Sequence, residues 1–339
     1  MEPVKILGIE TSCDETSIAV VENGQKILFN LVYSQIDLHK EYFGVVPEIA
    51  SRAHLEKINI LLEEGFAQSN LSYQDIDAVA VSNRPGLVGS LMTGVGTAKV
   101  ISSVFQKPLI GINHVLAHLY SNFLVSQNIS FPFIGLVVSG GHTLLLKVEA
   151  WNKVTIKGTT IDDAVGEAFD KVAKMLNLTY PGGPIIDKLA LQGNEKAISF
   201  PKITMYNKQK NNYNFSYSGL KTSVLYYLKK HKDINIDDIC ASFQKAAIDV
   251  LYDKTIRLAQ SEKIHTIVIA GGVAANSYLR KMFLENLENQ VFLPPQELCT
   301  DNAAMIAGLG YHFFKEKKFD KLDLNVYSKN DIPIGQGVI

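Results

Sequence analysis

The same strand–loop–strand pattern occurs twice in this chain, and this repeat limits the folds open to it. The first copy lies near the N-terminus and the second begins after Pro132. Gly8 aligns with Gly135 and Thr16 with Thr143, both at a separation of 127 residues. Two identities in so short a window can arise by chance, but the repeated order of elements favours an ancient duplication.

Each copy continues into alternating strands and helices, which predicts an α/β fold with a largely parallel sheet and right-handed crossovers. Asn23 and Gly24 form a hairpin turn signal between the second and third strands. One helix is expected to begin at Pro47, a second helix, rich in small residues, to end near Phe105, and a third to cover residues 162–176. The expected strands are residues 5–10, 17–22, 26–33, 75–81, 107–112, 133–138, 144–149, 151–157 and 265–270.

The composition is that of a soluble globular protein with a sizeable core. Of the 339 residues, 47% are apolar and 20% are charged, and the net charge of −1 argues neither for nor against nucleic acid. Cys13, Cys240 and Cys299 form no CxxC pair, which fits a reducing cytoplasm. No signal peptide is expected, and the apolar stretch 85–98 is too short for a membrane span.

His114 and His118 are the candidate metal ligands. Residues four apart lie on one face of a helix, so both imidazoles can reach one metal ion. Two polar groups on a helix surface would have the same spacing, and the spacing alone leaves both interpretations open. Residues 115–117 contain no acid, which argues against a zinc protease of the HExxH type.

Three loops that follow expected strands could hold phosphate. They are residues 11–16, 139–143 and 271–276. Ligands of open α/β folds bind at the carboxyl ends of strands. Glycine-rich loops there offer unobstructed N–H groups to an anion, although such glycines can also serve only tight turns. Three such loops, two of them related by the duplication, favour a phosphate site.

Residues 196–232 are strongly basic. This segment has eight lysines and no Asp or Glu, interleaved with Tyr206, Tyr213, Phe215, Tyr217, Tyr226 and Tyr227. Lysines neutralise phosphates and aromatic rings stack on unpaired bases, so the segment is a candidate RNA contact, with Lys229, Lys230 and Lys232 as the residues to test. The alternative is the solvated face of an inserted helical subdomain.

Motifs in order along nearly the whole chain resemble the bacterial TsaD family, the tRNA N6-adenosine threonylcarbamoyltransferases. The motifs that carry the resemblance are residues 8–16 (GIETSCDET), 44–48, 85–89, 114–118, 138–143 (VSGGHT), 166–171, 180–184, 215–222, 270–276 and 299–302. Arg84 departs from the glycine that the family often has before the Pro-Gly-Leu turn, and the residues between the histidines lack the family's frequent Glu.

The resemblance implies a duplicated actin-like ATPase (ASKHA) fold, with two lobes around a central cleft and helical insertions. We expect residues 1–110 to form the N-terminal lobe and residues 111–300 the C-terminal lobe, with a basic helical insertion near 196–232. We expect residues 301–339 to be a C-terminal helix and tail that return to the first lobe.

The resemblance also implies site residues. It implies one divalent metal, Fe²⁺ in preference to Zn²⁺, on His114, His118 and Asp301, although Asp301 could instead be a helix N-cap. Asp14 would assist the transfer as a base or positioning group, or else only cap its loop. The residues implied for threonylcarbamoyl-AMP binding are Val137, Val138, Ser139, Gly140, Gly141, Asp170, Gly183, Asp187 and Asn276.

The implied activity is transfer of threonylcarbamoyl from threonylcarbamoyl-AMP to N6 of the adenosine 3′ of the anticodon, in tRNAs that read codons beginning with A. ATP is a further possible ligand. The implied partners are tRNA, a paralogous TsaB-like subunit and a small TsaE-like ATPase, in the cytoplasm and without a membrane. Two alternatives from other classes are a metalloprotease and a small-molecule kinase of the same fold.

Overall fold

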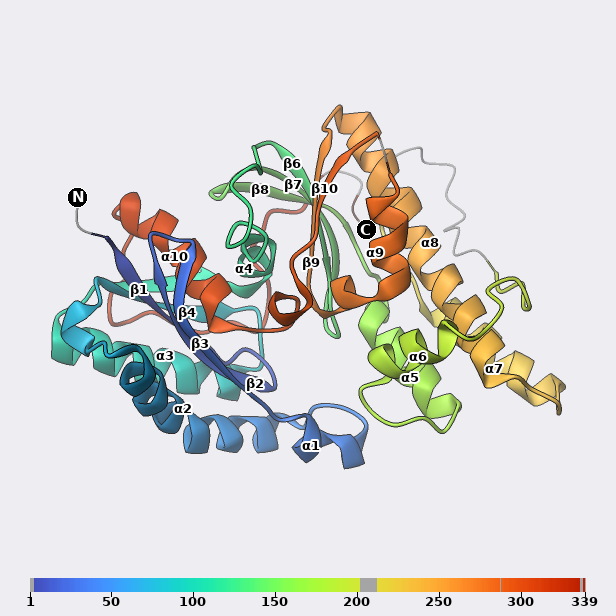
Figure 1. Ribbon diagram of the computed structural model, residues 1–339, viewed down its shortest axis with the longest axis horizontal. Coiled ribbons are helices and arrows are strands. Elements are labelled where there is room, and N and C mark those ends of the chain that lie inside the picture. The colour runs from blue at the N-terminus through green and yellow to red at the C-terminus, as the bar shows by residue number, and fades with distance from the viewer. Residues whose placement is uncertain (1–2, 202–211, 287, 336–337, 339) are drawn as a thin grey trace. The chain divides into compact units, whose positions relative to one another are not determined.

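Two five-stranded sheets with the same topology organise the computed structural model (Figure 1), which describes residues 3–201, 212–286, 288–335 and 338. The first sheet has the order β3-β2-β1-β4-β5 and the second the order β8-β7-β6-β9-β10. In each, a three-stranded antiparallel meander is extended by two parallel strands, so the sheets are mixed and not largely parallel as expected. The strands are β1 Lys5–Glu10, β2 Glu15–Glu22, β3 Lys26–Ser34, β4 Ala78–Arg84, β5 Leu109–Asn113, β6 Phe133–Val138, β7 Thr143–Ala150, β8 Lys153–Thr159, β9 Thr266–Ala270 and β10 Gln290–Phe292.

The residue pairing within the sheets supports the duplication in detail. Ile9 pairs with Ile18 in the first sheet and Leu136 pairs with Leu145 in the second, each 127 residues after its counterpart. The first meander turns at residues 23–24, where both φ angles are positive (52° and 77°), the conformation that an Asn-Gly hairpin turn requires. The expected repeat is therefore a repeat of structure as well as of sequence.

The two sheets belong to two compact units. One comprises residues 1–128 and 300–331, the other residues 129–299 and 332–339. The first unit thus extends to residue 128, beyond the boundary expected at residue 110, because α4 packs against α10 and β5. The C-terminal tail divides at residue 331 between the two units instead of returning entirely to the first.

Helices cover both sheets. In the first unit α10 packs on β1 and β2, while α2 and α3 pack together, α2 against β2 and α3 against β4. Among the described residues α3 is the one helix that could cross a membrane by length and composition, and 44% of it is buried inside the protein. The helices are α1 Ile36–His39, α2 Pro47–Ser69, α3 Val88–Phe105, α4 His114–Tyr120, α5 Val165–Met175, α6 Gly182–Ala190, α7 Ser218–Lys230, α8 Ile236–Glu262, α9 Ser277–Leu284 and α10 Ala303–Lys315.

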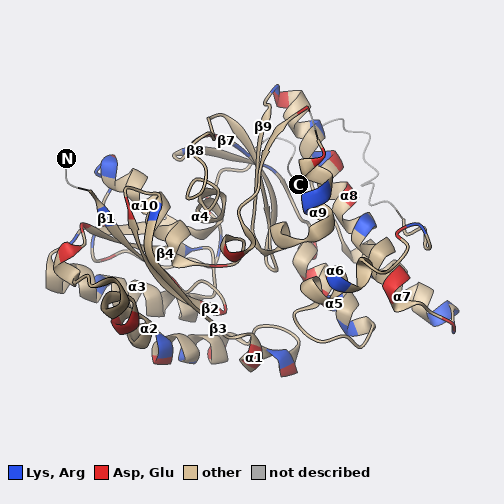
Figure 2. Ribbon diagram, in the orientation of Figure 1, with Lys and Arg blue, Asp and Glu red and all other residues tan. Residues whose placement is uncertain are grey.

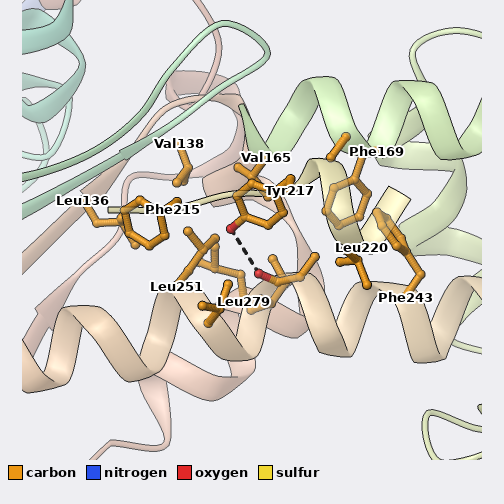
Figure 3. Close-up of a cluster of buried hydrophobic side chains, with 14 of the residues drawn as sticks. Leu136, Val138, Val165, Phe169, Phe215, Tyr217, Leu220, Phe243, Leu251 and Leu279 are labelled. Carbon is orange, nitrogen blue, oxygen red and sulfur yellow. Dashed lines mark hydrogen bonds between the residues drawn. The ribbon is translucent and has the colours of Figure 1, made fainter. Parts of the chain in front are cut away.

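The core of the second unit joins its sheet to helices α5, α7 and α8 (Figure 3). Phe169 of α5 meets Phe243 of α8 edge-to-face, with ring centroids 5.0 Å apart, a favoured aromatic geometry. Tyr217, which is fully buried, donates its hydroxyl hydrogen bond to the carbonyl of Ala247 at 3.2 Å. This bond satisfies the one polar atom of the Tyr217 ring and fixes the start of α7 against α8.

Lys254 of α8 is a buried cation whose charge costs stability. Its side chain donates to the carbonyl of Asn214, and the residue is 7% exposed. Burial, and secondarily repulsion from Arg257, lowers the pKa of Lys254 from 10.5 to about 8. Between these pH values the unfolded chain binds more protons than the folded protein, so the free energy of unfolding rises with pH.

We therefore expect wild type to gain about 3 kcal/mol relative to Lys254→Met as the pH rises from 8 to 10.5. Urea unfolding of both proteins across this pH range measures the difference between their free energies of unfolding. The titration of all other groups contributes equally to both proteins and cancels in this difference. Lys281→Met, at an exposed position of α9, is the matched control. A constant difference for Lys254→Met would contradict the burial argument.

Candidate metal and adenylate sites

The three residues proposed as metal ligands come together within the first unit. The Asn113 side chain accepts hydrogen bonds from Val115 N and Leu116 N and so caps α4, which places the two histidines one turn apart. The ligand atoms of His114, His118 and Asp301 all lie within 4.8 Å of one another. The Oδ1 atom of Asp301 is 3.1 Å from Nε2 of His118 and 3.6 Å from Nε2 of His114.

Asp301 does not cap α10. That position belongs to Asn302, whose side-chain oxygen accepts from Met305 N at 3.2 Å. The N-cap interpretation of Asp301 was therefore wrong by one residue. With the cap supplied by its neighbour, the Asp301 carboxylate points to the histidines.

The His118 ring shows that the cluster fits a metal ion. Both of its ring nitrogens are buried and have no hydrogen-bond partner among the described residues, although Nε2 lies 3.1 Å from Asp301 Oδ1. A buried imidazole without hydrogen bonds is costly unless a ligand satisfies it. Two imidazole nitrogens and one carboxylate oxygen are donors that suit Fe²⁺ or Zn²⁺ and leave further coordination positions for a substrate.

Glu10, at the end of β1, is a neighbour of the cluster that the sequence analysis did not identify. Its Oε2 atom lies 2.9 Å from His114 Nδ1. Burial lowers the pKa of His114, but the negative charges of Glu10 and Asp301 outweigh it and raise that pKa to about 9. The sequence signal that could have identified Glu10 is a carboxylate directly after the apolar run of residues 6–9.

Asp14 lies near the same cluster, in the loop between β1 and β2. Burial, and next the negative charge of Asp301, raise the pKa of the Asp14 carboxyl group. The backbone carbonyl of Asp14 accepts a hydrogen bond from Gln35 N at 3.0 Å, which holds the loop. The carboxyl group of Asp14 is thus within electrostatic reach of Asp301, a candidate metal ligand, and its role as a base stays a prediction.

In the second unit, the loop after β6 forms an open turn. Val137 and Val138 end the strand, and His142 N donates to Ser139 Oγ at 3.1 Å across the turn. A Cβ atom added at Gly140 or Gly141 would meet nothing within 4 Å. The loop therefore has free space beside its backbone, as a phosphate-binding turn needs.

Helix α5 supports this turn from behind. A Cβ atom at Gly166 would lie 2.6 Å from the carbonyl oxygen of Ser139, so only glycine permits the approach. One turn later, Asp170 accepts a hydrogen bond from Gly182 N at 2.7 Å and holds the start of α6. Gly183 follows with open space at its Cβ position.

Asp187 and Asn276 contact each other. Asn276 Nδ2 donates to Asp187 Oδ1 at 3.2 Å and to Gln244 Oε1 at 2.7 Å, while its Oδ1 caps α9. Asp187 also accepts from the backbone N and the Oγ of Ser277, at 3.0 and 2.7 Å. The network fixes the start of α9, and Gln244 is a member that the sequence analysis missed.

Comparisons with known proteins identify the family. The model of the TsaD family, described as tRNA N6-adenosine threonylcarbamoyltransferase, matches residues 26–308. A protein of that name from Thermosipho melanesiensis is 52% identical over 312 residues, which cover 91% of this chain and 94% of the relative. Another from Brachyspira hyodysenteriae is 48% identical over 330 residues, 96% of each chain. The chain belongs to the TsaD family.

Membership in the TsaD family confirms the resemblance found in the sequence and makes the chain a transferase that modifies tRNA. The crystal structure of HypF from T. kodakarensis matches with a TM-score of 0.63 and 15% identity, over 93% of this chain and 49% of HypF. At that identity the likeness concerns the fold alone. With the repeated sheet topology, it confirms the duplicated actin-like fold expected from the sequence.

The basic segment of this TsaD family member is only partly suited to nucleic acid. Lys229, Lys230 and Lys232 are exposed at and beyond the end of α7 (Figure 2). Tyr226 is 66% exposed, whereas the Tyr227 ring is partly buried and stacks on His231. Other members lie outside the described residues: Lys202, Tyr206, Lys208 and Lys210.

Three of the aromatic residues proposed to stack on bases cannot do so. Tyr213, Phe215 and Tyr217 are 5%, 0% and 0% exposed, because they pack into the core of the second unit. Aromatic residues at the start of a helix serve a core as readily as a base, and only tertiary contacts distinguish the two. The surface expected to stack on bases therefore does not include these three rings.

Arg84, where the chain departs from the usual family pattern, holds the C-terminal segment. Its Nη1 atom lies 2.5 Å from Asp331 Oδ2, and its guanidinium lies over the Tyr327 ring, 4.3 Å from the centroid. Through these two contacts Arg84 holds residues 327–331 against the end of β4.

Proposed function

We propose that this chain transfers the threonylcarbamoyl group of threonylcarbamoyl-AMP to N6 of the adenosine 3′ of the anticodon, in tRNAs that read codons beginning with A. The products are N6-threonylcarbamoyladenosine and AMP. The cluster of His114, His118 and Asp301 in a TsaD family member carries the proposal. The open turn at Gly140 and Gly141 supports an adenylate site in the same chain.

The chemistry is an acyl-type transfer. The exocyclic amine attacks the carbamate carbonyl, a C–N bond forms, the anhydride C–O bond breaks, and AMP leaves with the electron pair. The N–H groups of Gly140 and Gly141 would hold the phosphate of the departing AMP. Asp14 would accept the amine proton or orient the amine.

His114, His118 and Asp301 would hold one divalent metal, Fe²⁺ in preference to Zn²⁺. A metal of this kind polarises oxygens and takes up developing negative charge. In the second unit, the residues that would bind the adenylate are Val137, Val138, Ser139, Gly140, Gly141, Asp170, Gly183, Asp187 and Asn276. Elemental analysis of protein purified without added metal tests the choice of iron.

The geometry gives no support to the protease. Val115, Leu116 and Ala117, between the histidines, are all buried and apolar, so no side chain there can activate a water. A kinase would use magnesium on oxygen ligands, whereas two of the three clustered donors are imidazoles.

The decisive experiment supplies threonylcarbamoyl-AMP and a tRNA with adenosine 3′ of its anticodon, and looks for the added mass on that base. We propose that a TsaB-like paralogue and a small TsaE-like ATPase, which would use ATP, work with this chain in the cytoplasm. The assay is therefore run with and without them. No product in either case would refute the proposed function.

The exposed lysines at and just beyond the end of α7 are proposed to contact the anticodon stem-loop. Changing Lys229, Lys230 and Lys232 together to Glu should weaken tRNA binding at least about tenfold at low salt, because three phosphate-neutralising charges are reversed. Metal content should stay unchanged. The same exchange at Lys26, Lys40 and Lys153, which are exposed on other elements, is the control. Equal tRNA affinity for both triple variants would contradict the proposed contact between these lysines and tRNA.

A further inference from the structure

Glu10 is a fully buried carboxylate that contacts His114 and the loop that follows β1. Its Oε2 atom lies 2.9 Å from His114 Nδ1, and its Oε1 atom accepts a hydrogen bond from Ser12 N at 2.5 Å. Ser12 Oγ lies 3.1 Å from the same His114 Nδ1. The three residues thus form a closed ring of contacts, which compensates the cost of burying the carboxylate.

These contacts select the tautomer that His114 adopts when its imidazole is neutral, as a metal ligand must be. A carboxylate only accepts hydrogen bonds, so the proton of the Glu10–His114 bond resides on Nδ1. In a neutral imidazole, Nε2 then has the free electron pair. Nε2 is also the atom nearer to Asp301, at 3.6 Å.

The second repeat shows that this carboxylate is not required by the fold. The residue 127 positions after Glu10 is Val137, which pairs with Leu144 as Glu10 pairs with Ser17. Val137 is fully buried and apolar. The same strand position therefore accommodates a hydrophobic side chain, and only the repeat that contains the histidines has an acid there.

We propose that Glu10 is a positioning residue that fixes His114 in its Nδ1-protonated tautomer, aims Nε2 at a metal ion, and ties the histidine through Ser12 to the loop of Asp14. This inference rests on the metal site of the proposed function. Carboxylate partners of ligating histidines raise the basicity of the ligand and fix its orientation, and losing one typically costs 10- to 100-fold in metal affinity.

The test measures Co²⁺ binding, independently of transferase activity. Glu10→Leu, which mimics the apolar second repeat, should lower Co²⁺ affinity about 10- to 100-fold in chelator competition and shift the Co²⁺ absorption bands. Glu10→Gln keeps an acceptor for Nδ1–H and should lose less. Glu22→Gln, in the partner strand β2, is the matched control and should bind as wild type does.

A second measurement uses wild type only and so does not depend on how variants fold. Nitrogen-15 NMR of the Zn²⁺-loaded protein should show His114 protonated on Nδ1 and metal-bound through Nε2. Coordination through Nδ1, or a folded Glu10→Leu protein with unchanged affinity, would overturn the inference alone. Failure of wild type to bind either metal would overturn both this inference and the proposed metal site.

Discussion

His118→Ala should remove the bound metal and lower the transfer rate at least about a hundredfold. His118 supplies one of three clustered donors, and its buried ring nitrogens have no other hydrogen-bond partner in the part of the chain that the structure describes. Two remaining donors hold a divalent ion weakly, so the charge that develops on the carbonyl oxygen loses its stabilisation. Metal content per chain and initial rates at saturating adenylate measure the two effects.

The control for this variant is His265→Ala, which removes an exposed histidine just before β9 and should change neither quantity. Because His118 is buried, Asp301→Asn serves as a second variant that keeps the volume of the side chain and removes its charge. Both ligand variants should lose metal while they keep the far-ultraviolet circular dichroism of wild type. Full activity in a metal-depleted His118→Ala protein would refute a role for the cluster in catalysis.

The sequence predicts the sheets of this protein well because local signals and the repeat agree. The strand β6 has the expected bounds, and the turn at Asn23 has the backbone that its sequence predicts. The cluster of candidate metal ligands could also be predicted in part, since two of the three residues follow a helical spacing. The third ligand, Asp301, is 183 residues from His118, and only the family resemblance suggested it.

Features that depend on tertiary packing could not be predicted from the sequence. Helix α8, 27 residues long, was not predicted, because its buried residues surround much of its circumference and leave a weak periodic signal. The role of Glu10 depends on a contact with a residue 104 positions away. Whether Tyr217 packs into a core or faces solvent likewise depends on α8, which residue type and local spacing do not reveal.

Gly141→Leu should weaken binding of AMP and of the adenylate at least about tenfold without lowering stability. The position has free space for a side chain, so the fold is expected to tolerate the change. The new side chain would fill the space that the proposal gives to the phosphate and would shield the N–H groups of the turn. Calorimetric titration with AMP and thermal unfolding of the ligand-free protein separate binding from folding.

Two further glycines make this prediction specific. Gly166→Ala places a Cβ atom 2.6 Å from Ser139 O, so it should both weaken AMP binding and destabilise the protein by about 1–3 kcal/mol. Gly96→Leu, on α3 of the other unit, also enters open space and should leave AMP binding unchanged. If Gly141→Leu binds AMP as tightly as Gly96→Leu does, the phosphate does not lie at this turn, because a leucine there would obstruct it.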